Sequence, residues 1–360
     1  MKVVHNLLFS LLSFFAVGQA PLFEFLDLRY SSNLPKSLAS ERSIVIVQVP
    51  DQVDGVRRVG DWQALSEKAH KAFITMGIDV VTYLNRYDLV ASPNSRKAFA
   101  AFFVDRNIQN VLFLRANSDR SCELIIAPFN GKESLINYGA TVYRASANQL
   151  SSVLLETGKE IRRADFSNEN FLIPSKPNFT SGLSIVERTL LQNYPGILRR
   201  SKLSVERFAT IPVPKNASEE TIREITNYNE IIGKKNVELD TLLKQHPYDF
   251  EVIDPTSDDD LLRSRRQFVL RSITGQAKTL RQMLDYNVTE GETDFVSIIP
   301  IMPDQTKAKP IPKDALVHKF YVRQNISKNI HVGEWDADVT WQQALQNMIG
   351  NLIQEHNVDK

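Results

Sequence analysis

Glu41–Pro50 reads ERSIVIVQVP, and this apolar, β-branched run between charged residues and a proline is the segment that decides the fold class. Such a run is typical of a strand buried in a parallel sheet. Glu206–Pro214 (ERFATIPVP) echoes it, and SRKAF at Ser95–Phe99 is echoed by SRRQF at Ser264–Phe268. The offsets of the two echoes are similar, 165 and 169 residues. The echoes predict that one α/β unit occurs twice in the chain.

The residues around the first run predict a complete unit of alternating strands and helices. Asp61 is expected to cap a helix that Gly77 stops, and Ser92-Pro93 is expected to open a second helix. Strands are predicted at 44–49, 78–84, 111–114, 123–128 and 140–143, and a closing helix at 148–163. Two early helical crossovers require parallel strands, because such connections are right-handed and pack helices on the sheet. The later strands are expected to extend the sheet antiparallel.

The second half of the chain predicts the same kind of unit with longer helices. Strands are predicted at 209–213, 249–253, 295–301, 319–323 and 329–332, and helices at 218–245, 258–286 and 340–355. The predicted fold is therefore α/β, with two similar tandem modules, each a mixed sheet flanked by helices. The expected domains are a signal peptide (1–18), a first module (19–165), a connector (166–205) and a second module (206–360).

The N-terminus has the pattern of a secretory signal peptide. Lys2 and His5 precede an apolar run at 7–15, and Ala16-Val17-Gly18 supplies the small residues of a cleavage site. We therefore expect export to the periplasm or the extracellular space, with no transmembrane segment in the mature chain. The 43 Lys and Arg residues nearly balance the 42 Asp and Glu residues, so the charge offers no support for nucleic-acid binding.

Several motifs that would indicate a cofactor or catalytic chemistry are missing or incomplete. A phosphate loop needs a glycine-rich turn between a strand and a helix, and Gly275–Thr279 (GQAKT) has one glycine and lies in a helical pattern. The acidic run Asp254–Asp260 is interpreted as helix capping rather than a cation site. The six histidines have no zinc-ligand spacing, and Cys122, the single cysteine, is interpreted as a buried residue of a strand. No cofactor, metal or catalytic residue is predicted.

One resemblance is visible in the first module. Arg42–Pro50, Gly60-Asp61-Trp62 and Gly77-Ile78-Asp79 resemble uncharacterised exported bacterial proteins, some of which carry an NTPase label. The resemblance implies an exported α/β protein and transfers no functional residue.

Two classes of function are consistent with these patterns. The leading hypothesis is a non-enzymatic binding or scaffold protein with a partner among the proteins of the cell envelope, and the oligomeric state is left open. The alternative is a ligand-binding protein or a hydrolase, with nucleotides as one candidate substrate. It would use the crevice at the carboxyl ends of the parallel strands, where such sheets bind ligands. The candidate ligand-binding residues there are Asp51, Asn85, Asn117, Lys215 and Asp254.

Overall fold

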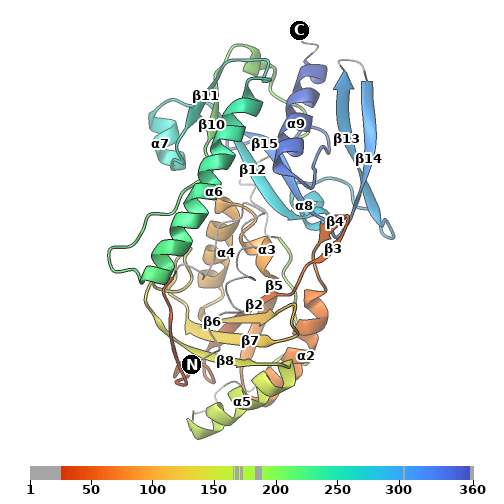
Figure 1. Ribbon diagram of the computed structural model, residues 1–360. Coiled ribbons are helices and arrows are strands. Elements are labelled where there is room, and N and C mark those ends of the chain that lie inside the picture. The colour runs from red at the N-terminus through yellow and green to blue at the C-terminus, as the bar shows by residue number, and fades with distance from the viewer. Residues whose placement is uncertain are drawn as a thin grey trace.

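The computed structural model describes residues 26–164, 166, 170, 173–182, 189–302 and 305–356. The predicted signal peptide at 1–18 lies outside these residues. Figure 1 shows the two halves of the chain as two layered α/β units, the second above the first.

The first unit is built on a mixed sheet of six strands in the order β1-β8-β7-β6-β2-β5. The strands are β1 (Arg29–Ser31), β2 (Arg42–Gln48), β5 (Asp79–Asn85), β6 (Ile108–Ala116), β7 (Cys122–Pro128) and β8 (Thr141–Ala147). Strand β2 pairs in parallel with β5 and β6, whereas β7 pairs antiparallel with β6 and β8. Strand β1 closes the edge in parallel with β8.

The second unit repeats this arrangement strand by strand, in the order β9-β16-β15-β12-β10-β11. Its strands are β9 (Leu190–Leu191), β10 (Leu203–Glu206), β11 (Phe250–Ile253), β12 (Phe268–Gln276), β15 (Leu316–Gln324) and β16 (Ile330–His331). Strand β10 pairs in parallel with β11 and β12, and β15 lies antiparallel between β12 and β16. The short edge strand β9 is parallel to β16, as β1 is to β8. The predicted pair of similar α/β modules is confirmed.

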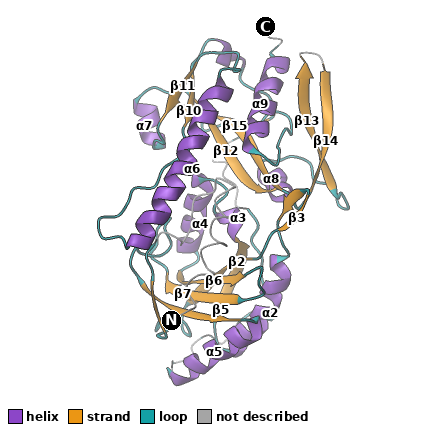
Figure 2. Cartoon of the chain, in the orientation of Figure 1, coloured by secondary structure: helices purple, strands orange, loops and turns teal. Residues whose placement is uncertain are grey.

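The helices are α2 (Trp62–Thr75), α3 (Arg86–Leu89), α4 (Pro93–Asp105), α5 (Leu150–Arg163), α6 (Glu219–Leu243), α7 (Asp258–Arg263), α8 (Ala277–Met283) and α9 (Trp341–Glu355), with a 3-10 helix at Gly196–Arg199. Helix α2 corresponds to α6 and α5 to α9 in the order of elements, whereas α8 has no counterpart between β6 and β7. One face of the first sheet packs against α2 and α5, and one face of the second packs against α6 and α9. Figure 2 shows α2 and α5 beneath the first sheet and the long α6 along the side of the molecule.

Two antiparallel hairpins are added to this plan. They are β3 (Gln52–Asp54) with β4 (Val56–Arg58), and β13 (Asp294–Met302) with β14 (Gln305–Pro312). The β13–β14 hairpin packs Phe295 and Ile311 into the core cluster on the far face of the second sheet.

The short sequence echoes do not align corresponding elements. The second echo pairs residues of α4 with the turn that leads into β12, and Glu206–Pro214 begins where β10 ends. The duplication is therefore visible in topology, whereas the quoted echoes are not the corresponding positions. Strand β9 and the first three residues of β10 come from residues predicted as connector.

Two elements predicted in the second half are wrong. The helix predicted at 258–286 is α7, β12 and α8 in succession, and the left-handed backbone of Arg265 (φ 57°) interrupts it. Strand β12 lies between β10 and β15 and is covered on both faces, so its apolar side chains point both ways and imitate a helical pattern. The strand predicted at 209–213 contains Pro212, is followed by Pro214, and is held against α6 instead. There the side-chain oxygen of Asn229 accepts a hydrogen bond from the backbone N–H of Ile211 (2.8 Å).

The two modules are joined by direct contacts. The N–H of Thr274 in β12 donates to the carbonyl oxygen of Ala91 (2.9 Å), and the N–H of Val59 donates to that of Asp314 (2.8 Å). Asp27 accepts a hydrogen bond from the N–H of Ser218, the residue that caps α6 (3.2 Å). These contacts place the start of α4 next to the second sheet.

Asp88 in α3 predicts a pH dependence of stability. Burial raises the pKa of its carboxyl group to about 7, against a smaller opposing effect of the hydrogen bond from the Gly182 amide. A carboxyl group whose pKa is higher in the folded state stabilises the fold at acidic pH, and stability falls as the pH rises from about 4 to about 7. We expect Asp88→Asn to raise the free energy of unfolding at pH 8 by on the order of 2 kcal/mol and to leave it little changed at pH 4.

Urea denaturation at both pH values measures this effect. Asp54→Asn is the control, because Asp54 is an exposed carboxylate at the turn of the β3–β4 hairpin. An equal effect of the Asp88 substitution at pH 4 and pH 8 would contradict the prediction.

Cys122 at the start of β7 is buried, with 6% of its surface exposed, and burial raises the pKa of its thiol. A thiol reagent reacts with the accessible thiolate. We therefore expect an aromatic disulfide reagent to label the native protein at pH 8 at least about a hundredfold more slowly than the urea-unfolded protein. Labelling at similar rates in both states would show that the thiol is accessible.

Candidate functional site

The structure brings two of the five predicted ligand-binding residues together. Asp51 follows strand β2, Asn85 is the last residue of the neighbouring strand β5, and both side chains contact Tyr87. The Tyr87 hydroxyl donates to Asp51 Oδ2 (2.5 Å), and the Tyr87 N–H donates to Asn85 Oδ1 (2.9 Å). Asp51 also accepts from Arg57 Nε (2.5 Å). These side chains are thus engaged in local hydrogen bonds around a buried ring.

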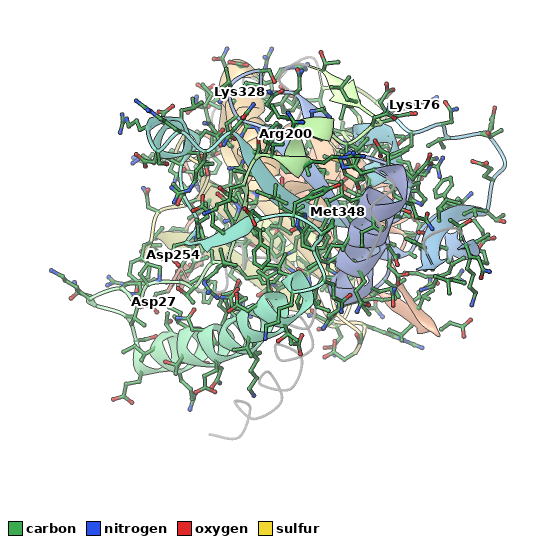
Figure 3. The ribbon with its side chains drawn as sticks, turned by 90° about the horizontal axis from the view of Figure 1, so that it is seen from above. Asp27, Lys176, Arg200, Asp254, Lys328 and Met348 are labelled. Carbon is green, nitrogen blue, oxygen red and sulfur yellow. The ribbon has the colours of Figure 1, made fainter. Side chains whose placement is uncertain are left out.

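The other three predicted residues lie apart. The side-chain amide of Asn117 donates to Ser121 Oγ (2.9 Å) inside the turn between β6 and β7. Lys215 is exposed in the turn before α6, and Asp254 is exposed after β11. Figure 3, which looks down on the second module, shows Asp254 at the periphery of the molecule.

The phosphate-loop candidate does lie at a strand–helix junction, between β12 and α8, which the sequence pattern did not indicate. The backbone amides of this junction already donate hydrogen bonds within the protein. The N–H of Ala277 donates to Ala315 and that of Lys278 donates to Lys313, each over 2.9 Å to a carbonyl oxygen. A phosphate loop needs such amides free to face the anion. The junction therefore does not form one.

A cavity of about 540 Å³ lies between the second sheet and the first module. The second module supplies the residues that follow the carboxyl ends of β10 and β11, the middle of β12 and one side of α6. The first module supplies Val90, Ala91 and the first turn of α4, from Ser92 to Lys97. The cavity therefore occupies the crevice that the carboxyl ends of parallel strands form, but only in the second module and with other residues than those predicted.

One end of the cavity is apolar and contains a buried cation. Lys235 on α6 is 8% exposed, and its Nζ has no hydrogen-bond partner among the described residues. The Nζ lies 5.9 Å from the centre of the Phe208 ring, which itself packs edge-on against Trp341 with ring centres 5.1 Å apart. Burial lowers the pKa of the Lys235 amine to about 8, so the amine is mainly charged at pH 7.

His318 on β15 lies in the same cavity wall. Its Nδ1 is 2.8 Å from the hydroxyl of Thr274 on β12. Burial, together with the positive charge of Lys235, lowers the pKa of the His318 ring to about 3. The imidazole is therefore neutral at pH 7, and Lys235 is the positively charged side chain beside it.

Paired charges form the opposite end. Arg271 on β12 contacts Glu206 (Nε to Oε2, 3.4 Å) and Asp258 (Nη2 to Oδ1, 2.9 Å), and Arg323 also contacts Asp258 (2.6 Å). Burial acts to raise the pKa of Asp258, but the two arginines outweigh it and hold this pKa below its usual value. These carboxylates are already neutralised by neighbouring arginines.

The sequence contained a signal for Lys235 that the predictions did not use. The buried positions of α6 are Thr221, Ile225, Tyr228, Ile232, Lys235, Leu239 and Leu243. Lys235 stands in this stripe at helical spacing, whereas its neighbour Lys234 is exposed. A lysine in the apolar stripe of an amphipathic helix is rare unless it is paired, so it marks a candidate site.

Among the described residues, no three or more His, Cys, Asp or Glu side chains are grouped to hold a metal ion. No helix in the described part of the chain is both long and apolar enough to cross a bilayer. Comparison of the chain with protein-family models, with curated proteins and with solved structures finds no match.

Proposed function

We propose that this chain is an exported protein that binds a small molecule in the cavity between its two modules. The proposal of export rests on the signal-peptide pattern of residues 1–18. The observation that carries the binding function is the cavity itself. Its volume of about 540 Å³ is that of pockets that enclose small organic ligands, and it lies at the carboxyl ends of parallel strands.

The composition of the wall supports this proposal. Apolar side chains from one face of α6 and from the second sheet line much of the cavity, including Ile232, Leu239 and Phe320. A few polar groups converge among them, above all Lys235 and His318. Apolar walls with a small number of placed polar groups are typical of sites that bind metabolites.

Thermal unfolding in the presence of a small-molecule library tests the proposal. We expect some compounds to raise the Tm of the mature protein, and Ser272→Trp to abolish this increase by filling the cavity, because Ser272 lines it. Ser151→Trp on the exposed side of α5 is the matched control and should respond as the wild type does. The proposal fails if no compound stabilises the wild type, or if the Ser272 variant is stabilised equally.

The scaffold hypothesis, with a partner protein in the cell envelope, has narrower support. The β13–β14 hairpin exposes Val296 (51%) and Ile301 (59%), which a partner could cover. Strand β14, however, carries Lys307, Pro310 and Pro312, and lysine and proline are the residues that keep edge strands from pairing. A partner for this hairpin stays a prediction, and capture of tagged protein with and without residues 294–312 would test it.

A further inference from the structure

The charge on Lys235 is the feature of the cavity that the chain itself leaves without a partner. A buried ammonium group that lacks a counter-charge or a hydrogen-bond acceptor costs stability. Such a group is retained where something else supplies the counter-charge. The charge of the nearby Glu238 acts to raise the pKa of Lys235, but this effect is smaller than that of burial. Glu238 is exposed and accepts a hydrogen bond from Gln342 Nε2 (2.9 Å), and no hydrogen bond joins it to Lys235.

The carboxylates of the cavity wall do not supply that counter-charge either. Glu206 and Asp258 are engaged with Arg271 and Arg323, as described above. The remaining two, Glu133 and Asp259, are exposed side chains at the rim. The apolar end around Lys235 is therefore positive.

A second feature of the cavity wall, the start of helix α4, also carries positive charge. The first turn of α4 lines the cavity, and its residues from Ser92 to Asn94 form the amino-terminal end of the helix. The amino-terminal end of a helix carries a partial positive charge. The same turn also brings Arg96 and Lys97 into the cavity wall. The charge of Lys235 and the positive end of α4 thus line one cavity together with the aromatic side chains of Phe208 and Trp341.

We propose that the ligand of this cavity is an organic monocarboxylate with an apolar body. Its carboxylate pairs with Lys235, and its body packs against Phe208 and Trp341. This inference rests on the function proposed above and specifies the class of ligand. A single buried cation without a hydrogen-bond partner favours one negative charge at that end of the cavity. The aromatic pair favours an aliphatic or aromatic body over a sugar.

Calorimetric titration of the mature protein with matched probes tests the assignment. The probes are straight-chain carboxylates of four to ten carbons and phenylpropionate, each compared with the alcohol and the amine of the same skeleton. We expect at least one carboxylate to bind the wild type at least tenfold more tightly than its alcohol, and the amine to bind more weakly still.

Lys235→Met separates this inference from the proposed function. Methionine keeps much of the volume of the side chain and removes the charge, so the variant is expected to fold and to bind the alcohol as the wild type does. The preference for the carboxylate should disappear. Lys234→Met, one residue away and exposed, is the matched control and should keep the preference.

The outcomes are distinguishable. Equal binding of acid and alcohol by the wild type, or an unchanged preference in the Lys235 variant, overturns the monocarboxylate assignment and leaves the binding function standing. If no acid, alcohol or amine binds the wild type, the monocarboxylate assignment is overturned, and the thermal unfolding test with the compound library decides the binding function separately. In NMR titrations, the pKa of His318 should be higher in the carboxylate complex than in the free protein. The reason is that the bound carboxylate offsets the charge of Lys235, which helps to lower this pKa.

Discussion

Lys319→Met is expected to lower the free energy of unfolding by about 3–5 kcal/mol, because it leaves a carboxylate buried without its counter-charge. The Lys319 Nζ lies 2.6 Å from Asp336 Oδ1, and both side chains are fully buried. Lys319 also donates to the carbonyl oxygen of Val332 (2.6 Å), and Asn351 donates to Asp336 Oδ2 (3.0 Å). Burial raises the pKa of Asp336 and lowers that of Lys319, so each group depends on the other to remain charged.

Urea denaturation followed by circular dichroism measures this loss. Lys313→Met is the matched control, because Lys313 is exposed, and it should change stability by less than about 0.5 kcal/mol. The double variant Lys319→Met with Asp336→Leu should recover much of the loss, since it removes both charges together. Equal stability of the two single methionine variants would contradict the prediction.

Arg271→Met is expected to cost about 3 kcal/mol and to do so mainly at neutral pH. Among the described residues, Arg271 is the only one that forms an ion pair with Glu206, whereas Asp258 keeps its ion pair with Arg323. Burial already raises the pKa of Glu206, against the opposing effect of Arg271. Without the arginine this pKa rises further, and a carboxyl group with a raised folded-state pKa loses stability as the pH increases above about 4.5.

Denaturation at pH 4 and pH 7 therefore tests both the size and the sign of the effect. The stability lost by Arg271→Met should be smaller at pH 4, where Glu206 is protonated in both the folded and the unfolded state. Addition of Glu206→Gln should restore part of the loss at pH 7. A loss that is the same at both pH values, and that Glu206→Gln does not relieve, would assign Arg271 a packing role instead.

The sequence predicted those elements whose own residues determine them. Asp61 accepts a hydrogen bond from the N–H of Ala64 (3.0 Å) and Ser92 one from Ser95 (3.1 Å), so both expected helix starts are confirmed. Strand β2 was also predicted correctly, because a parallel strand with neighbours on both sides and helices on both faces is apolar on both faces. Strand β12 is equally buried, but its mixture of arginine, serine and apolar residues also suits a helix, and only pairing with β10 and β15 decides between the two.

The site was predicted less well for a physical reason. The carboxyl ends of parallel strands were the correct region, yet in the first module Tyr87 and its hydrogen bonds to Asp51 and Asn85 occupy it. In the second module the cavity depends on α4, which is more than a hundred residues away in sequence from β10. Local patterns contain no information about such a distant wall. The exception is Lys235, whose place in the apolar stripe of α6 was visible in the sequence.

The shared wall of the cavity has a thermodynamic consequence. A ligand that contacts both α4 and the second sheet binds more tightly to the docked arrangement of the modules than to a separated one. By linkage, the free energy that the ligand gains from α4 is the same free energy by which it opposes separation. Ligand binding should therefore hold the two modules together more firmly. A protease that cuts the chain between the modules should then digest the liganded protein more slowly than the free protein.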